Sequence, residues 1–265
     1  IWEVAEDSAL MPRARELADR LAAGPTRAYA AVRKAMRQAM KVMGHQFVMG
    51  RDIEGARKRA NKGENKHYRY SFDMLGEAAM TRQDAQRYFE AYMAAIDAIG
   101  KSADDDDIFA VHSISVKLSA LHPRYEFARR QQALDELAPM LLELAKRAYA
   151  VDIGLTMDAE EADRLQLSLD IFEQVYTSTD LDGYQGLGLA VQAYQKRGAD
   201  VVRWLTALSK RVGRRIPVRL VKGAYWDTEI KHAQELGLPG YPVFTRKVNT
   251  DVSYLACARL MLAAG

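Results

Sequence analysis

The chain has very little cysteine, no long apolar run and no strong excess of charge. Cys257 is the one cysteine among 265 residues, which excludes an internal disulfide framework and favours a reducing compartment. No stretch approaches the ~18 apolar residues of a membrane-spanning helix. Lys and Arg number 38 against 35 Asp and Glu, a balance that does not favour nucleic acid as a partner. These absences predict a cytoplasmic protein.

The motifs of several common enzyme classes are also missing. No G-x-G-x-x-G turn follows the first expected strand, and no G-x-x-x-x-G-K-[ST] phosphate loop occurs. No G-x-S-x-G nucleophile motif is present. The five histidines are scattered without the spacing of metal ligands. A doubly wound nucleotide-binding fold, a serine nucleophile of that type and a metal site are therefore not favoured.

Apolar strand patterns alternate with helix patterns through most of the chain. Strands are expected at 68–77, 112–121, 152–161, 186–196 and 216–227. Helices are expected at 81–101, 129–149, 161–176, 198–213, 228–237 and 250–265, after two earlier helices separated at Gly24-Pro25. This rhythm is typical of a parallel sheet covered on both faces. We predict an α/β fold, a partial (βα)8 TIM-like barrel of about five βα units preceded by a helical segment.

Each expected strand carries a polar or charged residue near its carboxyl end. These residues are Glu77, Lys117, Asp158, Gln192, Arg219 and Lys222. In parallel α/β folds the chemistry lies where strands end and loops begin. The polar strand ends therefore predict one site assembled from several strands.

Four of these residues have a structural and a functional interpretation. Asp158 is either the N-cap of the next helix or a carboxylate facing a cavity. Lys117 either extends its head to water or is paired or bound to an anion. The amide of Gln192 either satisfies the backbone or reads the edge of a ring. Arg219 is expected to point into the barrel mouth, where its guanidinium suits a phosphate, a carboxylate or an electron-rich heterocycle.

Six ordered motifs resemble a known family. They are "YSFDMLGEAA", "SVKLSALHPRY", "MDAEEADRL", "QAYQKR", "RLVKGAYWDTEIK" and "YPVFTRKVNTDVSYLACA". Together they resemble the proline dehydrogenase domain of bacterial proline utilization A, and the likeness runs from about residue 32 to residue 265. The resemblance implies a distorted (βα)8 barrel that binds FAD and oxidises L-proline to Δ1-pyrroline-5-carboxylate, by hydride transfer to flavin N5.

The resemblance also implies site residues and partners. Lys117, Asp158 and Arg219 are implied to lie around the flavin and the proline. Contacts to FAD are implied for Gln192, Arg219, Lys222, Gly223, Ala224, Tyr225, Trp226, Thr245, Arg246 and Lys247. Electrons are implied to pass to a quinone at the membrane surface, which adds a peripheral contact with the inner membrane face to the cytoplasmic location. Full-length members carry an aldehyde dehydrogenase module, and this segment carries no DNA-binding part.

The chain departs from the family pattern at both ends. The sequence stops before the last barrel strands and before the arginine pair that the family uses for the proline carboxylate, so a truncated barrel with little activity of its own is expected. Residues 1 to about 31 instead resemble the C-terminal tail of enoyl-CoA hydratases. The expected domains are 1–31, a crotonase-like tail; 32–67, a helical lead-in and loop; and 68–265, the N-terminal part of the barrel.

Two other functions stay open. The chain could be a non-catalytic fragment or fusion that acts as a helical interaction module, which uptake of FAD would distinguish from an enzyme. A crotonase-type acyl-CoA enzyme is a more distant alternative, because the residues that would bind CoA are not in the chain.

Overall fold

A computed structural model describes residues 7–22, 24, 26–76, 78–101 and 107–264. The chain divides into two compact units, residues 1–59 and 60–265. The first unit contains α1 (Asp7–Ala22), α2 (Thr26–Phe47) and most of α3 (Ile53–Ala60). The predicted break at Gly24-Pro25 is confirmed, because α1 ends and α2 begins on either side of it.

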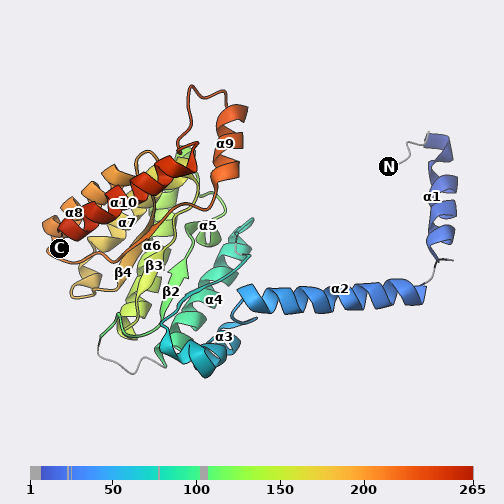
Figure 1. Cartoon of the computed structure of the whole chain (residues 1–265), viewed down its shortest axis with the longest axis horizontal. Coiled ribbons are helices and arrows are strands. Elements are labelled where there is room, and N and C mark those ends of the chain that lie inside the picture. Colours follow the sequence, from blue (N-terminus) through green and yellow to red (C-terminus); the bar gives the residue numbers. More distant parts are fainter. Residues whose placement is uncertain (1–6, 23, 25, 77, 102–106, 265) are drawn as a thin grey trace. The chain divides into compact units, whose positions relative to one another are not determined.

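Five parallel strands form the sheet of the second unit (Figure 1). They are β1 (Ser71–Asp73), β2 (Ser113–Val116), β3 (Leu155–Met157), β4 (Leu187–Gln192) and β5 (Val218–Val221). Each strand pairs in parallel with the next along the chain, so the order is β1-β2-β3-β4-β5. The predicted partial (βα)8 TIM-like barrel is confirmed as a half-barrel.

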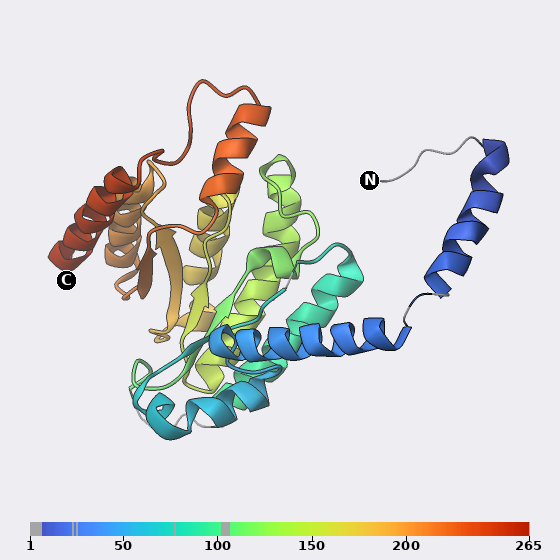
Figure 2. The ribbon, with the colours of Figure 1, turned by 45° about the vertical axis from the view of Figure 1, so that its right-hand side comes forward.

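Helices connect successive strands and pack along the sheet (Figure 2). The α-helices are α4 (Arg82–Gly100), α5 (Leu118–Leu121), α6 (Arg130–Ala150), α7 (Leu165–Tyr176), α8 (Gly198–Val212), α9 (Trp226–Glu235) and α10 (Lys247–Ala264). Short 3-10 helices are η1 (Gly63–His67), η2 (Phe127–Arg129), η3 (Ala162–Arg164) and η4 (Thr179–Leu181). Neighbouring pairs such as α4 with α6, α6 with α7 and α8 with α10 are in contact.

The pleat of the strands separates an apolar face from a polar face. Alternate residues of β2 to β4, among them Ile114, Leu155 and Leu189, are buried on the side that the helices cover. The residues between them, such as Ser115, point to the other face, because successive side chains of a strand alternate. The concave face of the half-barrel therefore carries the polar side chains.

Local signals explain where several elements begin. Thr81 caps α4 by accepting a hydrogen bond from the Asp84 amide, and the Asp84 side chain accepts in turn from the Thr81 backbone. This reciprocal pair is a capping box, and it begins the helix that the sequence predicted for 81–101. It fixes the first turn of the helix that follows the polar end of β1.

The strands are shorter than the sequence predicted. The strand expected at 216–227 is β5, which begins after Pro217 and ends at Val221. Gly223 then turns the chain with a φ of 139°, a conformation that residues with a Cβ rarely adopt. Glu77, expected at the end of the first strand, lies outside the described residues. Among the helices in the described part of the chain, none combines the length and the apolarity that crossing a bilayer requires.

Candidate active site at the strand ends

Asp158 lies at the centre of a charged network at the carboxyl ends of the strands. Its Oδ2 accepts a hydrogen bond from Lys117 Nζ at 3.0 Å, and its Oδ1 accepts from Arg219 NH1 at 2.9 Å. Lys117 Nζ also donates to Asp73 Oδ1 at 2.7 Å. The network thus joins β1, β2, β3 and β5, and it brings together three of the predicted strand-end residues, Lys117, Asp158 and Arg219.

Two serines complete the surroundings of Arg219. Its NH2 donates to Ser71 Oγ at 2.7 Å and to Ser115 Oγ at 2.8 Å. The two hydroxyls lie 3.0 Å apart. Because Arg219 is held on two sides by neutral and acidic groups, its guanidinium has a fixed orientation toward the concave face.

The network balances two cations with two carboxylates. The Asp158 side chain is only 13% exposed, while the Arg219 side chain is 36% exposed. A carboxylate that is buried to this extent needs an ion-pair partner and hydrogen bonds to offset the loss of hydration. Arg219 therefore combines a buried contact with an open side that a ligand can reach.

The structure decides between the two interpretations of Asp158 and Lys117. The helical segment after β3 begins at Ala162, with Glu161 as its N-cap, so the N-cap interpretation of Asp158 is wrong. Lys117 is paired with two carboxylates rather than only extended to water. Sequence reasoning missed Asp73, Ser71 and Ser115; the acid at the end of "YSFD" was the available signal for the first.

Gln192 is buried and bound by the backbone on both sides of its amide. Its Nε2 donates to the Glu160 carbonyl at 2.8 Å, and its Oε1 accepts from the Ala224 amide at 3.1 Å. This is the structural interpretation raised by the sequence. Gln192 ties the loop after β3 to the turn after β5.

The turn 222–226 is mostly exposed and ends at the start of α9. Lys222 Nζ pairs with Asp251 of α10 at 2.5 Å, and Lys247 pairs with the same carboxylate at 2.9 Å. The two ammonium groups, Lys222 first, lower the pKa of Asp251, and Asp251 raises the pKa of Lys222. The Trp226 indole donates to the Phe244 carbonyl at 3.0 Å.

A backbone pairing brings 245–247 to the same end of the sheet. The Lys196 amide donates to the Pro242 carbonyl at 3.0 Å, and the Phe244 amide donates to the Tyr194 carbonyl at 2.8 Å. Thr245, Arg246 and Lys247 follow directly and are exposed. The segments 222–226 and 245–247 therefore lie close together, beside the residues that continue β4.

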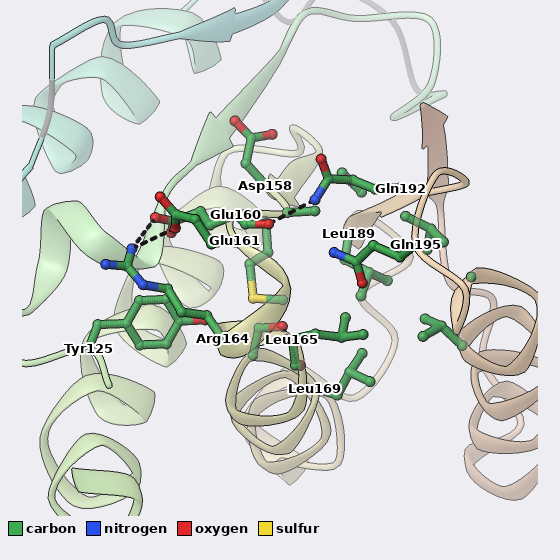
Figure 3. Close-up of a pocket in the computed structure, with 17 residues that line it drawn as sticks. Tyr125, Asp158, Glu160, Glu161, Arg164, Leu165, Leu169, Leu189, Gln192 and Gln195 are labelled. Carbon is green, nitrogen blue, oxygen red and sulfur yellow. Dashed lines mark hydrogen bonds and ion pairs between the residues drawn. The ribbon is translucent and has the colours of Figure 1, made fainter. Parts of the chain in front are cut away.

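A small pocket lies beside the network, between the ends of β3 and β4 and helices α7 and α8 (Figure 3). Its lining includes Asp158, Gln192 and the ion pair of Arg164 with Glu160, whose atoms are 2.9 Å apart. Arg164 also lies over the Tyr125 ring, 5.2 Å from its centroid. The enclosed volume of about 20 Å³ suits roughly one water molecule, so a large ligand has to bind on the open concave face instead.

Two further observations concern residues outside this network. Cys257 is fully buried and burial raises the pKa of its thiol, which agrees with a core residue. Within the described ranges, no group of three or more His, Cys, Asp or Glu side chains is arranged to hold a metal ion.

The fold and the site define a protein of the (βα)-barrel class with its polar residues at the carboxyl end of the strands. The family model described as "Proline dehydrogenase" matches residues 56–265. The chain therefore belongs to the proline dehydrogenase family.

Curated relatives and solved structures agree with this assignment. The chain is 53% identical to the bifunctional protein PutA of Salmonella typhimurium over 88% of its own length, and 51% identical to that of Rhizobium meliloti over 84%. A structure of a Bradyrhizobium japonicum proline utilization A mutant matches 89% of the chain with a TM-score of 0.79 and 55% identity. The Bdellovibrio bacteriovorus protein, solved after inactivation by N-propargylglycine, matches 87% with a TM-score of 0.82 and 26% identity.

The chain is much shorter than these relatives. It spans 18% of the Salmonella and Rhizobium proteins. It spans 24% of the Bradyrhizobium chain and 25% of the Bdellovibrio chain. The resemblance of residues 1–31 to an enoyl-CoA hydratase tail and the predicted boundaries near residues 31 and 67 stay predictions.

Proposed function

We propose that the chain forms part of a flavin site for the oxidation of L-proline to Δ1-pyrroline-5-carboxylate. The observation that carries this proposal is the Asp158 carboxylate held between Lys117 and Arg219, at 3.0 and 2.9 Å, on the concave face of a proline dehydrogenase half-barrel. Bound FAD would supply the hydride acceptor at its N5 atom. The protein's task is then to orient the two reactants and to place charge correctly.

The residues fit a flavin because they combine an open surface with fixed positive charge. Arg219 is partly exposed, and its guanidinium is aimed by Asp158 and two serines. A cation in this place stabilises the negative charge that accumulates on a reduced flavin ring. We assign this role to Arg219, with Asp158 and Lys117 beside the flavin and the proline.

The segments 222–226 and 245–247 are the proposed cofactor contacts. The first contributes Lys222, Gly223, Ala224, Tyr225 and Trp226, and the second contributes Thr245, Arg246 and Lys247. Lys222 and Lys247 share one carboxylate, so the pair keeps a net positive charge that suits a diphosphate. Two hydrogen bonds to the backbone hold Gln192 beside these segments. In this position we expect Gln192 to contact the cofactor.

We further propose the partners and location that the family resemblance implies. Electrons pass to a quinone at the membrane surface, and the protein is cytoplasmic with peripheral contact to the inner membrane face. The relatives from Salmonella and Rhizobium are named as bifunctional proteins, which supports an aldehyde dehydrogenase module in the full-length proteins.

We expect the 265-residue chain by itself to oxidise proline slowly. All four residues of β5 are only partly buried, and Lys222, Gly223 and Ala224 are exposed. Water therefore reaches the side of the site that Arg219 occupies and screens its charge. A proline carboxylate bound there has to compete with solvent.

Titration of the purified chain with FAD tests the proposal. We expect visible flavin absorbance to remain with the protein after gel filtration and flavin fluorescence to be quenched on binding. Arg219→Met should weaken binding, whereas Arg203→Met should not, because Arg203 is exposed on α8 and pairs with Asp200 within its own helix turn. Failure of the unaltered chain to take up FAD would favour the non-catalytic helical module.

A further inference from the structure

Glu229 is a buried carboxylate that the charged network does not contain. It lies in α9, one turn after the 222–226 segment, and its residue surface is 5% exposed. Its Oε1 accepts a hydrogen bond from the Ala162 amide at 2.6 Å, across 67 residues of sequence. The side chain thus reaches from the helix after β5 to the loop after β3.

The contact supplies an acceptor for a backbone amide in the loop after β3. Ala162 is the first residue of η3, whose N-cap residue Glu161 makes no side-chain capping hydrogen bond. The first amides of a helical segment have no partner within the segment, and a carboxylate is the acceptor they favour. Glu229 supplies that acceptor from another element.

A second tie connects the same two segments. Gln192 holds the Glu160 carbonyl with one end of its amide and the Ala224 amide with the other. Gln192 and Glu229 therefore hold the loop 158–162 at two points against the segment that begins at Lys222. Two separate points remove the hinge motion that one point would allow.

Stability alone does not account for a carboxylate in this position. Burial raises the pKa of Glu229, although the Ala162 amide opposes the shift. Asp163 and Glu161 add to the rise and His232 opposes it. An ionised group with a raised pKa makes the fold less stable than a neutral group of the same shape would.

We propose that Glu229 is a positioning residue that fixes the loop carrying Asp158 against the turn 222–226. The inference rests on the proposed flavin function, because a flavin bound at the turn requires a fixed separation between the turn 222–226 and the loop that carries Asp158. Asp158 orients Arg219, so a shift of the loop moves the guanidinium relative to anything bound at the turn. Glu229 acts through these groups and needs no contact with the substrate.

Hydrogen exchange resolved to single amides tests the bridge in the flavin-free chain. In Glu229→Ala we expect the protection of the Ala162 amide to fall about 10- to 100-fold, the range that loss of a charge-assisted hydrogen bond produces. Exchange in 222–227 should rise as well, while α4 and α6 stay unchanged. Glu229→Gln keeps an acceptor and should restore most of the protection. Glu235→Gln is the matched control, because that side chain is on the same helix and 59% exposed.

FAD binding provides the second readout. Glu229→Ala should raise the FAD dissociation constant, Glu229→Gln should recover part of the loss, and Glu235→Gln should leave it unchanged. Unaltered protection of Ala162 in Glu229→Ala, or a rise in exchange spread evenly through the fold, would overturn the inference. If the unaltered chain takes up no FAD, the proposed function fails, and the exchange data still decide whether the bridge exists.

Discussion

The substitution Asp158→Asn tests the centre of the charged network most severely. The asparagine oxygen can still accept from Arg219, but its NH2 group then faces Lys117 Nζ, which is also a donor. One charge-assisted hydrogen bond worth about 1.5–3 kcal/mol is lost, and the other weakens to a neutral-acceptor bond worth less. Lys117 keeps Asp73 at 2.7 Å and Arg219 keeps two serine hydroxyls, so neither cation is left bare.

The expected net effect is a loss of about 2–3 kcal/mol in the free energy of unfolding. The exposed part of Arg219 keeps the effect below the about 3–5 kcal/mol of a fully buried broken pair. Urea unfolding followed by tryptophan fluorescence measures it. Asp200→Asn is the control, because its side chain is 77% exposed and pairs within one helix turn, and it should cost under about 1 kcal/mol. Equal stability of the two variants would show that Asp158 does not hold the network together.

Three further perturbations have defined outcomes. Gly223→Ala puts a Cβ 2.4 Å from a tyrosine ring at a φ of 139°. We therefore expect the free energy of unfolding to fall by about 1–3 kcal/mol and FAD binding to weaken. Gly240→Ala, whose Cβ would meet no atom within 4 Å, should change neither. Hydrogen bonds, that from Arg82 first, lower the pKa of Glu136 from 4.5 to about 2. The stability that they give is present above pH 4.5 and is lost as the pH falls toward 2. Glu136→Gln should therefore flatten that part of an acid-unfolding curve. Cys257 is fully buried, so a thiol reagent should label it only in urea, and fast labelling of the folded chain would show that α10 is not docked.

The strands and their polar ends could be predicted because local pattern determines them. Compact apolar runs separated by helical periodicity mark a parallel sheet, and the rule that strand ends meet places Lys117, Asp158 and Arg219 together. Asp73 was missed because the first strand was extended to Glu77, four residues too far. Local sequence does not reveal where a short strand stops when its partner determines its length.

Long-range polar contacts could not be predicted in the same way. Ser71 and Ser115 carry no periodic signal, and their role appears only when β1, β2 and β5 curve around Arg219. The bond between Glu229 and the Ala162 amide joins a helix to a loop 67 residues away. The pattern around Glu229 is that of an ordinary amphipathic helix, so the sequence gives no reason to expect a buried acceptor there.

Anaerobic addition of L-proline to the FAD-loaded chain measures whether the site transfers a hydride from proline to the flavin. We expect a slow loss of visible flavin absorbance that depends on L-proline, is absent with D-proline and is much weaker in Arg219→Met. Bound flavin whose absorbance stays unchanged on addition of L-proline would show that this site does not oxidise proline.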